Sequence, residues 1–301
     1  MSYFPSKVTK PFLKWVGGKS QLITQIEAYY PFNDKRIKKY CEPFVGGGAI
    51  LFNILSHYKI SEAYISDVNL ELINTYQMIR DNLNEMLIEL KELQEAYLSM
   101  DHSNRQEFFY EKRKRFNELK SLGTEGNGIE KAVLMIFLNK TCFNGLYRVN
   151  RKGEFNVSMG AYANPIIYDE ENLKAVSYLL QSVQIVHGDY HLSEQFVDDA
   201  TFVYFDPPYR PISSTSNFTA YTEECFTDNE QIELAQYVNT LTERGAKILI
   251  SNSDPSNVNP WDTFFQDLYK GYHFYAVEAT RMINSKGSGR GKIYELLISN
   301  F

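Results

Sequence analysis

The chain has 301 residues, of which 44% are apolar and 23% are charged, which is enough to bury one sizeable core and a smaller second unit. The formal net charge is −6, the 3 cysteines have no paired spacing and the 5 histidines are scattered, so we expect neither a disulfide framework nor a metal site. The first residues are too polar for a signal peptide and no spanning segment follows, which argues against a membrane protein and favours a reducing, cytoplasmic compartment.

The first part of the chain, residues 1–70, has an α/β pattern. A helix is expected after the segment Gly-Gly-Lys-Ser, followed by a strand that ends at a glycine-rich turn. The apolar run at 49–55 predicts a buried helix, and the run at 63–66 predicts a second strand.

Residues 71–168 change character. Polar residues with helical periodicity continue to Lys120, a glycine-marked break follows at 123–128, and an apolar helix is expected over 129–139. We therefore predict an all-helical insertion at this place in the chain.

From residue 169 to residue 301 the α/β pattern returns, with helices expected near 171–182 and 228–244. Short apolar runs predict strands at 183–186, 202–205, 247–250, 272–277 and 294–298. With the two earlier strands, these give about seven strands in one sheet with helices on both faces, a Rossmann-like α/β fold.

A glycine-rich turn follows the first expected strand, where Phe44 precedes Gly46 and Gly48. Strand, glycine turn and helix are how such a sheet lets its backbone approach a nucleotide-like ligand. About twenty residues further on, Asp67 ends the next strand, where an acid accepts hydrogen bonds from ribose hydroxyls. The turn has neither G-x-G-x-x-G nor a phosphate-loop Gly-Lys-Ser/Thr, so S-adenosylmethionine fits better than NAD or ATP.

Asp206-Pro207-Pro208-Tyr209 follows an apolar strand directly. An adenine amino group is a poor nucleophile because its lone pair is delocalised into the ring. A carboxylate at Asp206 and a backbone carbonyl held by two prolines could accept both amino hydrogens, and Tyr209 offers a flat face for a purine, worth about 1–3 kcal/mol. Prolines cannot donate to a sheet ladder, so the strand must end here. Taken alone, the segment could also be a strand followed by a Pro-Pro turn.

Four motifs occur in order along the chain. They read Lys-Trp-x-Gly-Gly-Lys, Glu-Pro-Phe-x-Gly-Gly-Gly, Asn-Gly-Leu-x-Arg and Asp-Pro-Pro-Tyr, at residues 14–19, 42–48, 144–148 and 206–209. With these motifs the chain resembles the Dam-type DNA adenine-N6 methyltransferases of the D12 class, which include the GATC-modifying enzymes, from about residue 11 to its end.

The resemblance implies a discontinuous catalytic domain of residues 1–70 and 169–301 that uses S-adenosylmethionine, and a helical target-recognition domain of residues 71–168. The implied activity is methylation of the N6 amine of a flipped adenine in duplex DNA, in the site GATC. The cofactor would be bound by Trp15, Lys19, Phe44, Gly46, Gly48, Asp67 and Asp206. The catalytic residues would be Asp206, Pro207, Pro208 and Tyr209.

The segment Phe143–Arg148 is expected to be a turn after a helix. Arginine paired to guanine O6 and N7 is the commonest specific base contact, worth about 1–3 kcal/mol of discrimination. The resemblance implies that Arg148 contacts a guanine of GATC and Leu146 a thymine methyl. Phe143 and Asn144 would lie near the gap left by the flipped adenine, and Lys14 would contact the outer base pair.

Three windows contain basic residues and no acid, at 1–26, 131–153 and 279–294. The second window begins with Lys131, and the third is a Gly/Ser-rich segment that could close over DNA. Such windows suggest phosphate-facing surface despite the negative net charge. The basic cluster at 112–115 lies among acids on an expected helix, where a solvated face is the better interpretation.

Two alternatives remain open. One is a methyltransferase for another planar amine, cytosine N4 or a protein glutamine, although those relatives usually have Ser or Asn in place of Asp206. The other is a catalytically inert DNA-binding relative. We expect a monomeric bacterial or phage enzyme, and the sequence leaves open whether it serves restriction–modification, regulation or phage DNA.

Overall fold

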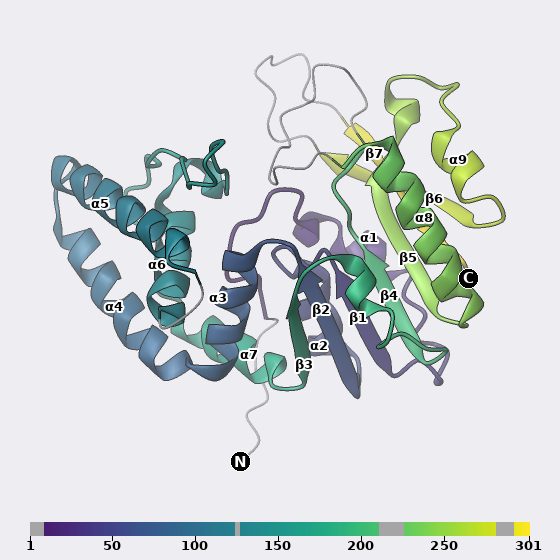
Figure 1. Cartoon of the computed structure of the whole chain (residues 1–301), viewed down its shortest axis with the longest axis horizontal. Coiled ribbons are helices and arrows are strands. Elements are labelled where there is room, and N and C mark those ends of the chain that lie inside the picture. Colours follow the sequence, from purple (N-terminus) through teal and green to yellow (C-terminus); the bar gives the residue numbers. More distant parts are fainter. Residues whose placement is uncertain (1–8, 124–126, 211–225, 281–291) are drawn as a thin grey trace.

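The computed structural model of the chain describes residues 9–123, 127–210, 226–280 and 292–301. In these ranges seven strands form one sheet, with helices around it and a group of helices to one side (Figure 1). The α/β class and the strand count predicted from the sequence are confirmed. The strands are β1 (Lys39–Pro43), β2 (Glu62–Asp67), β3 (Val183–His187), β4 (Thr201–Phe205), β5 (Lys247–Ser253), β6 (His273–Thr280) and β7 (Lys292–Ser299).

The order of the strands in the sheet is β3-β2-β1-β4-β5-β7-β6. The first five strands in this order are parallel, and β7 is antiparallel to both β5 and β6. From β1 the chain adds β2 and β3 on one side, and it then returns to add β4 on the other side of β1. In open α/β sheets, ligands bind at the carboxyl ends of the strands at such a switch point. The segments that follow β1 and β4 meet there.

The central strands are buried on both faces, as is usual for parallel strands covered by helices. All five residues of β4 are buried. Side chains alternate between the faces, so Phe202 and Tyr204 belong to one apolar cluster, whereas Val203 and Phe205 belong to the other. The sheet is therefore held between two apolar layers.

Each layer is closed by helices. One contains residues of α1 (Ile23–Glu27), α2 (Ala49–His57) and α7 (Glu170–Leu180), and the other contains residues of α8 (Asp228–Glu243) and α9 (Phe264–Leu268). Helix α8 begins with a capping box in which the Thr227 side chain and the Glu230 side chain satisfy each other's backbone N–H groups. This fixes the first turn of α8 beside the end of β4.

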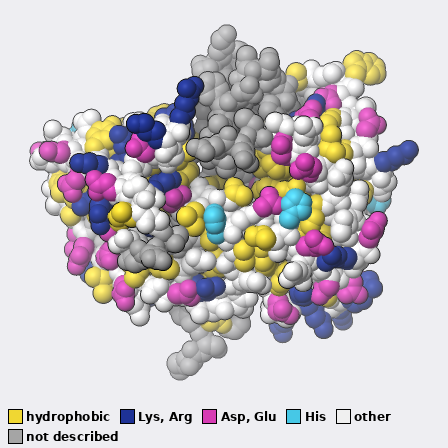
Figure 2. Space-filling model, viewed as in Figure 1, with side chains coloured by type: hydrophobic (Ala, Val, Ile, Leu, Met, Phe, Trp, Pro, Cys, Tyr) yellow, Lys and Arg dark blue, Asp and Glu magenta, His cyan; other side chains and the backbone are white. Residues whose placement is uncertain are grey.

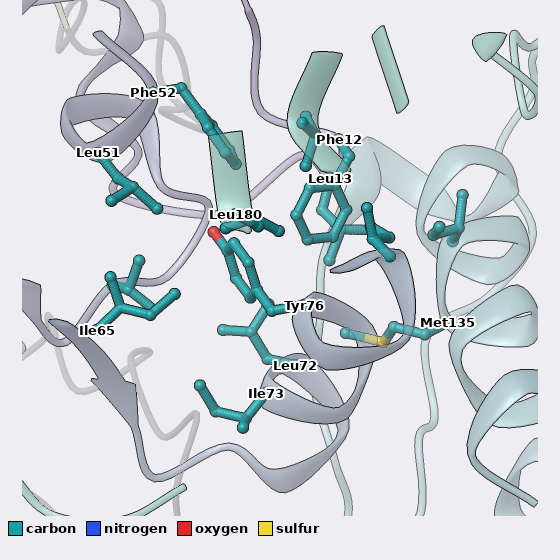
Figure 3. Packing of buried hydrophobic residues seen from close by; sticks show 14 of the residues in the cluster. Phe12, Leu13, Leu51, Phe52, Ile65, Leu72, Ile73, Tyr76, Met135 and Leu180 are labelled. Atoms are coloured by element: carbon teal, nitrogen blue, oxygen red, sulfur yellow. The ribbon is translucent and has the colours of Figure 1, made fainter. Parts of the chain in front are cut away.

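Four further helices lie beside the sheet: α3 (Leu70–Asp81), α4 (Leu83–Ser99), α5 (His102–Ser121) and α6 (Gly128–Thr141) (Figure 1). Helix α6 lies between the other three and is buried along most of its length. Helix α3 contacts α6 on one side and β2 and β3 on the other. The helical and sheet regions share one apolar cluster, in which Phe12 meets Tyr76 with ring centroids 4.8 Å apart and Met135 lies nearby (Figure 3).

The outer surface mixes charges of both signs. Figure 2 shows basic and acidic side chains side by side over α4 and α5. Lys112 pairs with Glu111 at 3.2 Å, and Lys114 approaches Glu118 at 4.0 Å. The solvated basic face expected at 112–115 is formed only in part: Lys114 is exposed, whereas Lys112, Arg113 and Arg115 are half-buried, and Arg113 donates to the Val157 carbonyl at 3.1 Å. None of the helices in the described ranges combines the length and the apolar character that crossing a bilayer needs.

Candidate active site

The turn between β1 and α2 requires its glycines. Gly46 and Gly48 have φ of 49° and 70°, in the left-handed region. A Cβ on Gly46 would lie 2.8 Å from Trp15 Cδ1, and a Cβ on Gly48 would overlap the hydroxyl of Tyr76. Phe44 also has a positive φ, 67°, which costs on the order of 1–3 kcal/mol in a residue with a side chain. The turn thus carries strain, and an indole ring lies against its backbone.

Asp67 is the last residue of β2, and its carboxylate is hydrogen-bonded to the glycine turn. Its carboxylate accepts hydrogen bonds from the backbone N–H groups of Gly46 at 3.1 Å and Asn69 at 2.9 Å. Burial raises the pKa of Asp67, although these hydrogen bonds act in the opposite direction. A carboxylate offers about four acceptor positions, so Asp67 keeps capacity for hydroxyl donors of a ligand.

Asp206 follows β4 and is paired with a buried lysine. Lys19 Nζ lies 2.8 Å from Asp206 Oδ1 and donates to the Gly17 carbonyl at 2.7 Å. The exposed fractions of the two side chains are 4% for Lys19 and 20% for Asp206. Burial raises the pKa of Asp206 to about 6, and Lys19 limits that rise. The carboxyl group is therefore mainly ionised at neutral pH.

Tyr209 forms one wall beside this pair. The Lys19 ammonium lies 4.7 Å from the centroid of the Tyr209 ring, and the Tyr209 hydroxyl donates to Glu295 Oε2 on β7 at 2.6 Å. The side chain is half-buried, which leaves part of the ring facing the cleft. A ring anchored at its hydroxyl is a suitable platform for a planar base.

Glu42 is a buried acid to which the sequence assigned no role. It lies at the end of β1 with an exposed fraction of 3%, and Tyr40 donates a hydrogen bond to its Oε2 at 2.7 Å. Burial raises the pKa of Glu42 to about 8, and the negative charge of Asp206 adds to the rise. The only sequence signal for this residue is its place in the Glu-Pro-Phe motif.

One cleft of about 1450 Å³ joins these groups. Its volume is larger than the 300–1000 Å³ of an ordinary small-molecule pocket, so the cleft has room for a cofactor and a target base together. The predicted cofactor and catalytic residues are all brought together here: Trp15, Lys19, Phe44, Gly46, Gly48, Asp67, Asp206, Pro207, Pro208 and Tyr209. Tyr190 is buried in the wall, where its ring centroid lies 5.3 Å from that of Phe44. Among the described residues, no group of His, Cys, Asp and Glu side chains could hold a metal ion.

The predicted base-contacting residues lie on a loop after α6, which we call loop 142–160. The loop begins with a 3-10 turn at Phe143–Gly145, in which Asn144 has φ of 55°, and this confirms the expected turn. Phe143 is 53% exposed, whereas Leu146 is half-buried against the core. Arg148 is exposed and donates from Nε to Asn156 Oδ1 at 2.9 Å.

Asn139 links this loop to the N-terminal motif, and sequence reasoning missed it. Its side chain accepts from the Lys14 backbone N–H at 2.8 Å and donates to the carbonyls of Lys14 at 2.8 Å and Gly145 at 2.9 Å. Lys14 itself is exposed, with Nζ 3.3 Å from the Tyr162 hydroxyl. The predicted outer-base contact and the predicted base-contacting turn are thus held together by one buried amide.

A stacked aromatic pair makes a second link. The ring of Trp15 lies against that of Tyr147, with centroids 5.7 Å apart and an interplanar angle of 24°. Tyr147 donates to Glu71 Oε2 at 3.1 Å and accepts from Lys120 Nζ at 2.9 Å. Loop 142–160 therefore contacts a wall of the cleft directly.

The basic windows are only partly on the surface. Lys131 was expected to face phosphate, but this is wrong: its side chain is 3% exposed within α6 and its Nζ donates to the Gly123 carbonyl. Burial lowers the pKa of Lys140 to about 8. Arg151 and Lys152 are exposed at the tip of loop 142–160. Residues 1–8 and 281–291 of the other two windows lie outside the described residues.

The fold and the cleft together define a Rossmann-like methyltransferase, with a glycine turn after β1 and a carboxylate-proline segment after β4. The model of the D12 class N6 adenine-specific DNA methyltransferase family matches residues 15–283. The chain belongs to this family and is an adenine-specific DNA methyltransferase.

Three relatives match along nearly the whole chain. The Type II methyltransferase M.MjaIII of Methanocaldococcus jannaschii is 48% identical over 295 residues, which cover 97% of this chain and 99% of the relative. The Type II methyltransferase M1.LlaDCHI of Lactococcus lactis is 36% identical over 299 residues, which cover 97% and 95%. The DNA adenine methylase of Escherichia coli is 34% identical over 291 residues, which also cover 97% and 95%.

Proposed function

We propose that the methyl donor is S-adenosylmethionine, which would supply an electrophilic sulfonium methyl group in this cleft. The donor set fits it: Asp67 keeps acceptor capacity for ribose hydroxyls, the glycine turn brings backbone close, and Trp15 offers an aromatic face. The glycine turn after β1 has neither G-x-G-x-x-G nor Gly-Lys-Ser/Thr, in keeping with a cofactor that lacks phosphate.

The catalytic centre is proposed to be Asp206 with Lys19, Pro207 and Tyr209. The observation that carries this proposal is the ion pair of the buried Lys19 with the partly exposed Asp206, 2.8 Å apart in the cleft, because the ammonium favours the ionised form of the carboxylate. Asp206 and the Pro207 carbonyl would accept the two hydrogens of an adenine amine, and Tyr209 would stack on its ring. Positioning and fixed charges, without a covalent intermediate, would supply most of the acceleration.

Target recognition is proposed for the helical region of residues 71–168, in which α3 contacts both α6 and the sheet. The adenine would be flipped out of duplex DNA into the cleft. Arg148 would contact a guanine, because its guanidinium is exposed and is oriented by Asn156. Phe143, with half its side chain exposed, and Asn144 would lie at the gap, Leu146 at a thymine methyl and Lys14 at the outer base pair.

The proposed target site is GATC, on the basis of the ordered motifs. Two relatives are named Type II methyltransferases, so we propose a role beside a restriction enzyme in the cytoplasm.

The test of the proposed substrate and target site is transfer of labelled methyl from S-adenosylmethionine to two duplexes, one with GATC and one with the same site already N6-methylated on both strands. Label on the first duplex alone supports both adenine and site. Label on both contradicts GATC, and label on neither contradicts the proposed substrate.

A further inference from the structure

Two buried amide side chains hold the backbone on both sides of Tyr209. Gln231 lies in the first turn of α8 and Asn252 lies in β5, and their exposed fractions are 0% and 1%. Gln231 Nε2 donates to the Pro208 carbonyl at 3.1 Å, and Asn252 Nδ2 donates to Gln231 Oε1 at 3.1 Å. Asn252 Oδ1 accepts from the Arg210 backbone N–H at 3.2 Å. A chain of hydrogen bonds therefore runs from the residue before Tyr209 to the residue after it.

The direction of these hydrogen bonds is fixed by the backbone. Asn252 Oδ1 accepts from two backbone N–H groups, those of Arg210 and, at 2.9 Å, Ser253. A backbone N–H can only donate, so the Asn252 amide cannot be reversed, and its NH2 group must face Gln231. Gln231 in turn must direct its own NH2 group to the Pro208 carbonyl. Each buried amide is satisfied in this one arrangement, whereas a reversed amide would leave buried polar atoms unpaired.

Arg210, which follows Tyr209 in the chain, is held by several further contacts. Its carbonyl accepts from the Ser253 hydroxyl at 2.8 Å. Its guanidinium pairs with Asp228 at 2.8 Å and Asp262 at 2.8 Å, and lies 4.2 Å from the centroid of the Phe264 ring. The backbone that follows Tyr209 is thus tied to β5, to the start of α8 and to the segment before α9.

The amide pair also distinguishes the two proline carbonyls. The Pro208 carbonyl is occupied by Gln231, whereas no group in the described ranges donates to the Pro207 carbonyl. We propose that Gln231 and Asn252 are positioning residues for methyl transfer. They keep Tyr209 beneath the target adenine and leave the Pro207 carbonyl open to the amine. This inference rests on the roles proposed above for Asp206, Pro207 and Tyr209.

The variant Gln231→Glu tests the donor directly, because it keeps the shape and replaces the NH2 group by an oxygen. An ionised carboxylate would repel the Pro208 carbonyl, but a protonated one can donate as the amide does. We expect kcat about tenfold to a hundredfold below wild type at pH 8, with unchanged cofactor affinity. The ratio of variant to wild-type kcat should rise as the pH falls to 6. Gln236→Glu, an exposed position on the same helix, is the matched control and should show a constant ratio near one.

The outcomes separate positioning from folding. Thermal melting measures the folded fraction of each variant, and Gln231→Met, which keeps the volume without a donor, replaces the glutamate variant if that one does not fold. The methionine variant should lose kcat at every pH. A folded variant with wild-type kcat, or a loss without the expected pH dependence in Gln231→Glu, would overturn the positioning role. Wild-type activity in Asp206→Ala would instead overturn the proposed catalytic roles.

Discussion

Replacement of Lys19 by methionine removes the only cation within hydrogen-bonding distance of Asp206 among the described residues, while keeping a long, flexible side chain. The ammonium lies 2.8 Å from Oδ1, and an opposite charge so close usually lowers a carboxyl pKa by about 1–3 units. Its loss should raise the pKa of Asp206 from about 6 to about 7–9, a change of about 1.4–4 kcal/mol in the free energy of ionisation.

The pH dependence of kcat/KM for the DNA substrate measures this shift. Wild type should rise with pH and level off above a pKa of about 6. With a pKa near 8.5, only about a tenth of the Asp206 side chains would be ionised at pH 7.5, so the variant should be about tenfold slower there and recover towards pH 9.

The control is Lys174→Met, which removes a lysine paired with Glu170 on α7. It should leave the pH profile unchanged. Cofactor affinity is measured separately at each pH. Lys19→Met could instead lower kcat/KM equally at every pH and leave the apparent pKa of the profile at its wild-type value. That result would show that Lys19 does not set the charge of Asp206.

Three further predictions concern single positions. Burial raises the pKa of Glu42 from 4.5 to about 8, so the contribution of Glu42 to the stability of wild type falls as the pH rises between these values. Glu42→Gln should therefore gain stability relative to wild type from pH 5 to pH 8, by on the order of a few kcal/mol in urea unfolding, whereas a constant difference would refute this. Gly46→Ala should weaken cofactor binding in calorimetry, because its Cβ would lie 2.8 Å from the Trp15 indole; Gly271→Ala, also at positive φ but with open space, should not. Arg148→Ala should reduce discrimination at one guanine by about 1–3 kcal/mol in competition binding, and a loss of cofactor affinity instead would contradict its role.

The sheet could be predicted from the sequence because each strand is marked by a local run of apolar residues. The strands 202–205 and 247–250 are short apolar runs bounded by turn residues, and each forms a buried strand. The cofactor and catalytic residues could also be found, since Gly46, Asp67 and Asp206 each lie at the carboxyl end of a strand or within three residues of it. Their meeting in one cleft depends only on the general rule that carboxyl ends of parallel strands share an edge.

What the sequence could not show depends on contacts between distant segments. Asn139 is joined to Lys14 across 125 residues, and Gln231 is joined to Pro208 across 23. Neither residue lies in a motif, so no local pattern marks it. The prediction for Lys131 is wrong for a related reason. A window of like charges does not reveal which lysine has its ammonium hydrogen-bonded to a carbonyl inside the fold.

The most direct test of the catalytic centre is a single-turnover measurement with Asp206→Ala at saturating S-adenosylmethionine and excess duplex. Asp198→Ala is the matched control, since Asp198 is a half-exposed acid before the same strand and pairs with Lys39. We predict that the Asp206 variant transfers methyl to adenine N6 at least about a thousandfold more slowly than wild type, and that the Asp198 variant stays within a few-fold. A transfer rate in the folded Asp206 variant within about tenfold of wild type would contradict the assignment of this carboxylate to the reaction.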